Sequence, residues 1–268
     1  MRSEELIQAG RLSEAVASLN QEAKDDPQDL RTRTTLFELL CVLGEWQRAE
    51  RTLAVMAELS VEVAEGVVPY QKLLAAEGKR RGFLQGGPPP LLPAGGEQLA
   101  PYLDAVKQIA AGKTTEAAAL LDQAELQRPR PSGQRSGAAF ADLRDADDRF
   151  AAVLEVLLGE EYAWLPLAAL RTLQVYPPRH LRDIVFAPAM VDWGPGPQPV
   201  FLPVRYPGSE QDERPEVRLA RRTTSRQDLA APVLCLGQRV LLLDDTAVPL
   251  LELGALQLKG GRNNGDHA

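Results

Sequence analysis

Cysteine, histidine and long apolar runs are all scarce in this 268-residue sequence. The two cysteines, Cys41 and Cys235, each stand alone in an apolar run, so they predict neither a disulfide nor a paired metal site. No run of about 18 apolar residues occurs, and the start MRSEELIQAG lacks the apolar stretch of a signal peptide. We therefore expect a cytoplasmic protein with reduced thiols that spans no membrane.

The two histidines, His180 and His267, leave little material for acid–base catalysis. A histidine-based triad would have to use His180, with Asp183 nearby in PPRHLRD. In a loop of this kind, a solvated or structurally hydrogen-bonded histidine is more common than a catalytic base. We expect no enzyme, no catalytic residue and no cofactor, and a hydrolase centred on His180 stays open as the alternative.

Lysine and arginine total 30 against 37 aspartate and glutamate residues, which gives a formal net charge of −7. This balance repels polyanions, so we expect neither nucleic acid nor an anionic membrane as a partner. Two acidic clusters lack the glycine and the distal glutamate of a calcium loop, so helix capping and a hairpin turn are preferred to metal binding. The clusters are Asp142, Asp145, Asp147 and Asp148, and then Asp244 and Asp245.

A pattern of glycine, alanine and leucine repeats in the first half of the chain. Each glycine is followed five residues later by alanine and nine residues later by leucine, and the units start 34 and 68 residues apart. A 34-residue period is typical of the tetratricopeptide helix pair, in which glycine permits the turn and alanine lets the helices approach. The three sets are Gly10, Ala15 and Leu19; Gly44, Ala49 and Leu53; and Gly112, Ala117 and Leu121.

The unit between the second and third sets departs from this pattern. Gly78 keeps the period, but Phe83 and Gly87 stand where alanine and leucine are expected. The following segment, GGPPPLLPAGG, predicts a loop because its prolines and glycines prevent a continuous helix.

The groove face of these hairpins supplies the candidate partner contacts. In the second unit it is mostly polar, whereas in the third unit it is apolar. The third hairpin is therefore rotated, or its groove face is covered, and we favour cover by the rest of the chain over a bound helix. The predicted contacts are Arg31, Thr34, Glu38 and Cys41, with Tyr102 and Val106 if the third unit is open.

The second half of the chain has a different pattern of apolar and polar residues. Acidic residues precede a helical stripe of Phe150, Val153, Leu154 and Leu157, which predicts a helix that ends at Gly159. After Pro177 come short β-like runs that predict a small, mostly antiparallel sheet. The fold class is thus α+β. We predict a tetratricopeptide-like domain over 1–130, a linker over 131–139, an α+β domain with a leading helix over 140–260, and a disordered tail over 261–268.

Several segments, taken in order, resemble one protein family. They are LFELLCVLGEWQRAERTLAVMAEL, DADDRFAAVLEVLLGEEYAWLPLAAL, LRDIVFAPAMV, LPVRYPGSE and RLARRT. Together they resemble the accessory proteins of bacterial type VI secretion called ImpE, SciE or TagJ, over about residues 5 to 258. Departures are confined to Ser225 after RRT and to GPGPQP before VFLP.

The resemblance implies a cytoplasmic, non-catalytic adaptor of the contractile sheath. It implies that the protein binds an N-terminal helix of the small sheath subunit and influences sheath handling or recruitment of the disassembling ATPase. Helical repeats agree with this, since they form grooves for amphipathic helices. A general helical scaffold unrelated to secretion stays open as an alternative.

Overall fold

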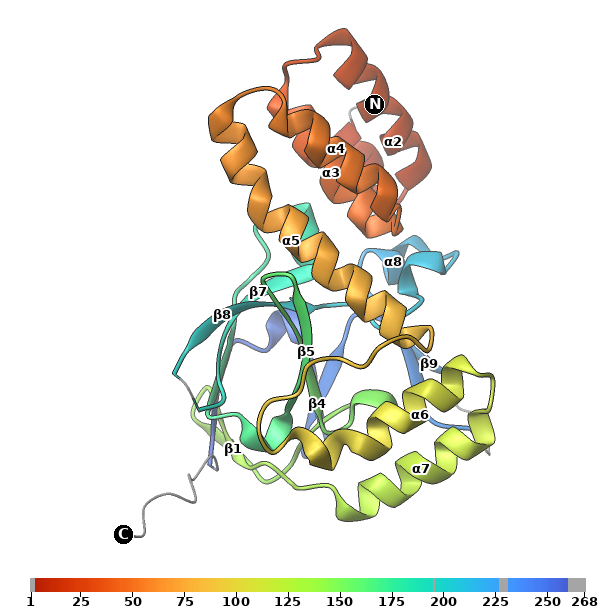
Figure 1. The fold of residues 1–268 in the computed structure, drawn as a ribbon, viewed down its shortest axis with the longest axis vertical. Coiled ribbons are helices and arrows are strands. Elements are labelled where there is room, and N and C mark those ends of the chain that lie inside the picture. The colour runs from red at the N-terminus through yellow and green to blue at the C-terminus, as the bar shows by residue number, and fades with distance from the viewer. Residues whose placement is uncertain (1–2, 195, 227–230, 260–268) are drawn as a thin grey trace.

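The computed structural model describes residues 3–194, 196–226 and 231–259. Helices make up the first half and antiparallel sheets the second, which confirms the predicted α+β class (Figure 1). The predicted tail and His267 lie outside the described residues. The helices of the first half are α1 (Ser3–Gln8), α2 (Leu12–Asp25), α3 (Leu30–Leu43), α4 (Trp46–Ala57), α5 (Val61–Leu84), α6 (Ala100–Ala110) and α7 (Thr114–Gln127).

The three predicted hairpins are present as α1–α2, α3–α4 and α6–α7. Gly10, Gly44 and Gly112 lie at their turns with φ of 73°, 70° and 74°, a left-handed conformation that favours glycine. The alanines of the pattern are fully buried between the paired helices, and the leucines beside them are buried as well. The repeat therefore has the packing role that the sequence predicts.

Helix α5 replaces the missing unit. Its 24 residues run without a turn through Gly78, and Ser60 caps its start by accepting a hydrogen bond from the Val63 N–H. Figure 1 shows α5 crossing diagonally from the first hairpins over the β part. The segment after it is the predicted loop. Leu91 of that loop bridges β5, donating its N–H to the Tyr162 carbonyl at 2.9 Å and accepting from the Trp164 N–H at 2.9 Å.

An eight-stranded antiparallel sheet dominates the second half, with the order β2-β1-β13-β6-β7-β8-β4-β5. Smaller sheets pair β12-β11-β3 and β10-β9, and α8 (Pro215–Arg218) precedes β9. The strands are β1 (Gly133–Arg135), β2 (Ala138–Phe140), β3 (Leu143–Asp145), β4 (Val153–Leu158), β5 (Glu161–Pro166), β6 (Thr172–Val175), β7 (Phe186–Asp192), β8 (Gln198–Pro203), β9 (Thr223–Arg226), β10 (Leu234–Gly237), β11 (Val240–Leu243), β12 (Thr246–Pro249) and β13 (Ala255–Leu258).

The predicted leading helix of the second half is wrong. Only the short 3-10 helix η2 (Asp148–Phe150) forms there, and the apolar run after it is strand β4. A short, nearly continuous apolar run fits a strand buried on both faces as well as a helical stripe, and β4 is buried along almost its whole length. The segment expected as a linker, 131–139, contains β1 and part of β2, while the domain division itself stays a prediction.

The two faces of the large sheet have different neighbours. One face carries alternate residues such as Leu154, Val156 and Leu202 and forms an apolar core with the β12-β11-β3 sheet. The other face, at its β4–β5 end, packs beneath α5 and joins the apolar core of the helices. Among the described residues, no helix is both long enough and apolar enough to cross a membrane.

Candidate functional site

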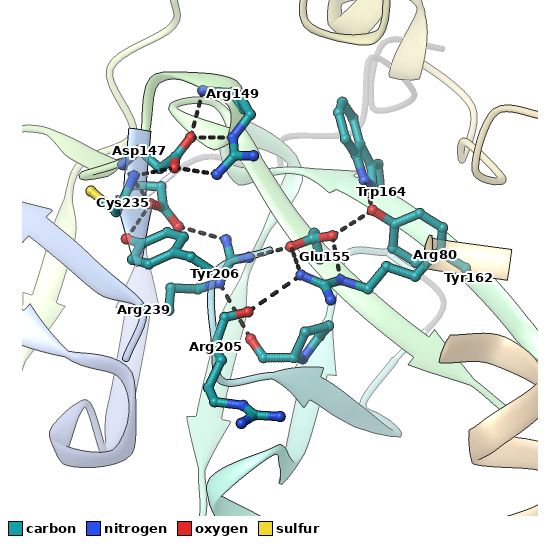
Figure 2. Close-up of polar contacts among 12 residues, drawn as sticks. Arg80, Asp147, Arg149, Glu155, Tyr162, Trp164, Arg205, Tyr206, Cys235 and Arg239 are labelled. Carbon is teal, nitrogen blue, oxygen red and sulfur yellow. Dashed lines mark hydrogen bonds and ion pairs between the residues drawn. The ribbon is translucent and has the colours of Figure 1, made fainter. Parts of the chain in front are cut away.

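A buried ionic network joins α5 to the sheet (Figure 2). The Arg80 guanidinium of α5 donates from Nε to Glu155 Oε1 of β4 at 2.8 Å and from Nη2 to Glu155 Oε2 at 3.3 Å. Arg239 also donates to Glu155, and its Nη1 donates to Asp145 Oδ2 at 2.6 Å. Four charges from α5, β3, β4 and the β10–β11 turn therefore neutralise one another in the interior.

Aromatic hydroxyls complete this network. Tyr162 donates to Glu155 and accepts from Trp164 Nε1, while Tyr206 donates to Asp145 Oδ1 at 2.7 Å. Burial raises the pKa of Asp145 to about 6. Burial also opposes ionisation of Glu155, but the charges of the adjacent guanidinium groups outweigh it and lower the pKa of that carboxyl. The groups of this network are hydrogen-bonded to one another. The network is therefore better suited to holding α5 against the sheet, as a structural clamp, than to acting as a reactive centre.

The acidic cluster around Asp145 is distributed over several arginine pairs. Asp147 caps the short η2 and pairs with Arg149 at 2.7 Å, whereas the longer helix that the acidic cluster is predicted to cap does not form. Asp142 instead pairs with Arg128 at 2.6 Å. Asp244 and Asp245 form the turn between β11 and β12, which confirms the predicted hairpin turn. No group of three or more histidine, cysteine or acidic side chains within the described ranges is close enough to hold a metal ion.

The groove face of α3 is occupied by the chain's own β part. Glu38 accepts a hydrogen bond from Arg182 and a second from the Leu181 N–H at 3.2 Å, both in the 3-10 helix η4 (Leu181–Ile184). Cys41 is fully buried, and its carbonyl accepts from Arg205 Nη2 at 3.2 Å. Glu38 and Cys41 are therefore covered by distant segments of the chain and do not line an open groove.

The third unit is covered as well, which is the alternative that the sequence favours. Tyr102 and Val106 are 3% and 2% exposed, because α6 packs against η2 and its apolar residues join the core that the helices share with β4 and β5. Of the predicted contacts, only Arg31 and Thr34 lie at the surface, where Arg31 pairs with Glu4 at 2.6 Å. Contact of any of the six with a partner stays a prediction.

His180 and Asp183 lie in the same loop without forming an acid–base pair. Asp183 Oδ2 accepts the backbone N–H groups of Arg179 at 2.8 Å and of His180 at 2.9 Å, so this carboxylate caps η4. The His180 ring is exposed. The geometry therefore gives no support to a hydrolase centred on this histidine.

An uncovered apolar face lies beside α5. Cross-strand pairs Met190–Pro199 and Pro188–Phe201 place these residues on the same face of the sheet as Leu157, next to the region that α5 seals. None of the four residues of β7 and β8 is fully buried. With Val68, Pro69 and Lys72 of α5 as the second wall, they line an open groove of about 450 Å³.

The sequence carries a signal for this groove that the predictions missed. FAPAMVD and QPVFLP are apolar at nearly every position, whereas a strand with one solvated face alternates apolar and polar residues. Further along the same face, toward β6 and β13, the pattern does become polar, with Thr172 and Gln257. The β7–β8 stretch is thus a local apolar exception on an otherwise solvated part of the face.

The fold defines the class of this molecule: an α+β protein in which N-terminal helical hairpins are followed by antiparallel sheets. It is similar over 96% of the chain to the crystal structure of protein VPA1032 from Vibrio parahaemolyticus, with 97% of that chain covered, a TM-score of 0.88 and 25% identity. The type VI secretion system accessory component TagJ of Pseudomonas aeruginosa is 36% identical over 97% of this chain and 92% of its own length.

A protein-family model described as "ImpE protein" matches residues 137–257 of this chain. The chain belongs to the ImpE family and is a homologue of a type VI secretion accessory component. The resemblance found in the sequence is thereby confirmed.

Proposed function

We propose that this protein is a non-catalytic, cytoplasmic adaptor of the type VI contractile sheath that binds the N-terminal helix of the small sheath subunit. Its homology to a type VI accessory component supports the secretion role. The observation that carries the binding mode is the apolar groove between α5 and the β7–β8 face. An accessory protein that presents an apolar trough and neutralises its buried charges internally is suited to holding a partner.

The groove has the features that an amphipathic helix requires. Such a helix presents apolar anchors on one face at three- and four-residue spacing, and it needs two walls that exclude water from those anchors. Here the sheet supplies one wall through Met190 and Phe201, and α5 supplies the other through Val68 and Leu73. The anchors would bury apolar surface that the chain's own helices leave exposed, which is the main source of stability for such a complex.

By holding the small subunit, the adaptor would influence sheath handling or recruitment of the disassembling ATPase. Arg31 and Thr34 remain part of the proposal as accessible secondary contacts near the first hairpins. Glu38, Cys41, Tyr102 and Val106 could take part only if η4 or η2 moved away from them.

The test is co-purification with the small sheath subunit, in its full-length form and without its first ~20 residues, a length of about six helical turns. We expect the full-length subunit to be retained and the truncated one to be lost. The control is the sheath's large subunit alone, which should not be retained. Equal retention of both forms of the small subunit would contradict this binding mode.

A further inference from the structure

The groove beside α5 is apolar at one end, and at the other its rim carries an exposed arginine, Arg179, whose guanidinium pairs with no described residue. We infer that it selects an amphipathic helix carrying a carboxylate at one end, and that Arg179 receives this carboxylate and so sets which end of the helix lies over η4. This inference rests on the proposed function, since it takes the helix that the adaptor binds as the occupant of the groove.

Two hollows form one continuous trough. The apolar hollow is followed by a second of about 410 Å³, lined by Tyr70, Arg179, His180 and Arg182. The two share Tyr176, Pro188 and Phe201 as lining residues, so an occupant of the first can extend directly into the second.

Most charges in the second hollow are already engaged. Arg182 pairs with Glu38 and lies 4.7 Å from the centre of the Tyr70 ring. Asp183 is 4% exposed and accepts the backbone N–H groups of the loop. Arg182 is therefore compensated by Glu38, and the Asp183 carboxylate is buried and hydrogen-bonded to the backbone, with Arg182 Nε 3.9 Å away.

Arg179 differs from these neighbours. It is exposed, and its guanidinium forms no ion pair or hydrogen bond with the residues that the structure describes. The other cation on the rim, Lys72 at the apolar end, lies 3.9 Å from Glu160 and is thereby partly compensated. The two arginines at the η4 end are balanced in number by the buried carboxylates of Glu38 and Asp183, and Arg179 is the cation of this end that is exposed and whose guanidinium pairs with no described residue.

This distribution determines what the trough favours. The apolar stretch holds the hydrophobic stripe of a helix but does not determine its direction, because an apolar stripe fits in either orientation. A carboxylate one or two turns beyond the last anchor would meet Arg179, whereas a lysine there would be repelled. Rim charges of this kind contribute mainly to orientation and to selection among partners, and less to total affinity.

The experiment uses the full chain and a labelled synthetic peptide of the first ~20 residues of the small sheath subunit, with binding followed by fluorescence anisotropy. We expect Arg179→Glu to weaken binding about tenfold. The control is Lys113→Glu in the α6–α7 turn, which makes the same charge change outside the groove lining and should leave binding unchanged. Circular dichroism checks that both variants remain folded.

A charge exchange identifies the contact. Peptides in which each acidic residue in turn is replaced by lysine are tested against Arg179→Glu, and one of them should recover most of the lost affinity. Absence of recovery by every such peptide, or unchanged binding by Arg179→Glu, would overturn the inference. Strong binding by a native peptide without an acidic residue near either end would overturn it too.

Failure of this inference can be told apart from failure of the proposed function. If the native peptide binds the wild-type protein and Val68→Glu abolishes that binding, the groove is the site. An unchanged Arg179→Glu would then refute only the role of Arg179. If the wild-type protein does not bind the peptide at all, the proposed function fails and the inference fails with it.

Discussion

One face of the large sheet has two ends that are used in opposite ways. Beneath α5 the face is buried around Phe186, Trp164 and the Glu155 network. The ring of Phe83 on α5 packs edge-on against that of Trp164, with 5.3 Å between the ring centroids. Further along the same face, Met190 of β7 and Phe201 of β8 are only partly buried and line the open groove. The sealed end stabilises the fold, and the open end retains apolar surface for a partner.

Charged side chains are buried at the sealed end of this face, beneath α5, whereas the residues that the structure describes on the floor of the open groove are uncharged. Arg80 and Glu155 come from different halves of the chain, so their contact holds α5 at one position on the sheet. A buried pair costs desolvation and adds little net stability, but it penalises any arrangement that leaves one partner alone. An apolar floor makes no such demand, because it accepts any stripe of matching shape.

The largest effect is expected at the sealed end. Glu155→Leu removes the carboxylate that the buried guanidinium groups of Arg80 and Arg239 share. Among the described residues it leaves Arg80 with only one carboxylate contact, the longer one of 3.4 Å to Glu77. This should lower the free energy of unfolding by about 3 to 5 kcal/mol. Urea denaturation measures the change. The control is Glu160→Gln in the exposed β4–β5 turn, where we expect a change within about 0.5 kcal/mol. A loss below about 1 kcal/mol for Glu155→Leu would refute the clamp role.

The Glu155 carboxylate should also make the free energy of unfolding depend on pH. Since the pKa of Glu155 is lower in the folded protein than its usual value of 4.5, the unfolded chain takes up its proton first as the pH falls. The stabilisation is present above pH 4.5 and is lost below it, by at most about 1.4 kcal/mol per pH unit for one proton. Urea titrations between pH 3 and 6 should show a shallower acid slope for Glu155→Gln, and parallel slopes would contradict this.

At the open end, a substitution should alter binding and leave stability nearly unchanged. Val68 is 42% exposed at the groove wall, so Val68→Glu should change the free energy of unfolding by no more than about 0.5 kcal/mol. It should weaken retention of the small sheath subunit at least tenfold, because a charge would enter the apolar trough. Leu126→Glu on α7, where the leucine is 87% exposed, is the matched control and should bind normally.

The smallest effect is expected at Tyr102 of α6, in the apolar core of the helices. The Tyr102 hydroxyl is buried and has no hydrogen-bond partner among the described residues, and burial raises its pKa to about 12. Tyr102→Phe should therefore raise the free energy of unfolding by about 1 kcal/mol, since it removes a buried polar group that gains nothing in return. A loss of stability on thermal or urea unfolding would show that the hydroxyl is satisfied after all.

The structure confirms the predicted hairpins, but other segments of the chain cover part of the groove face on which partner contacts are predicted. The difference has a physical reason. Turns at Gly10, Gly44 and Gly112 depend on local backbone conformation and on contacts within one unit, so the repeat in the sequence was sufficient to find them. The cover of Glu38 by Arg182 joins residues 144 positions apart, and polar residues facing an ionic partner look the same in sequence as polar residues facing water.

The run VLEVLL shows a related ambiguity. Its apolar spacing satisfies a helix, yet in the folded chain it is strand β4, which pairs with β5 and β8 along its two edges and buries its two faces in the two apolar cores. The tertiary partners of such a short segment outweigh its periodicity.

By itself the sequence determined the hairpin spacing, the α+β order of the chain and its family, because these depend on local turns and on motifs that are contiguous in the chain. Only the tertiary structure decided which surfaces stay open. The repeat faces are covered by η4 at Glu38 and by η2 on α6, and the exposed apolar face lies instead on β7 and β8 beside α5. Exposure depends on which distant segment packs on top, and that is settled by long-range contacts that no local pattern records.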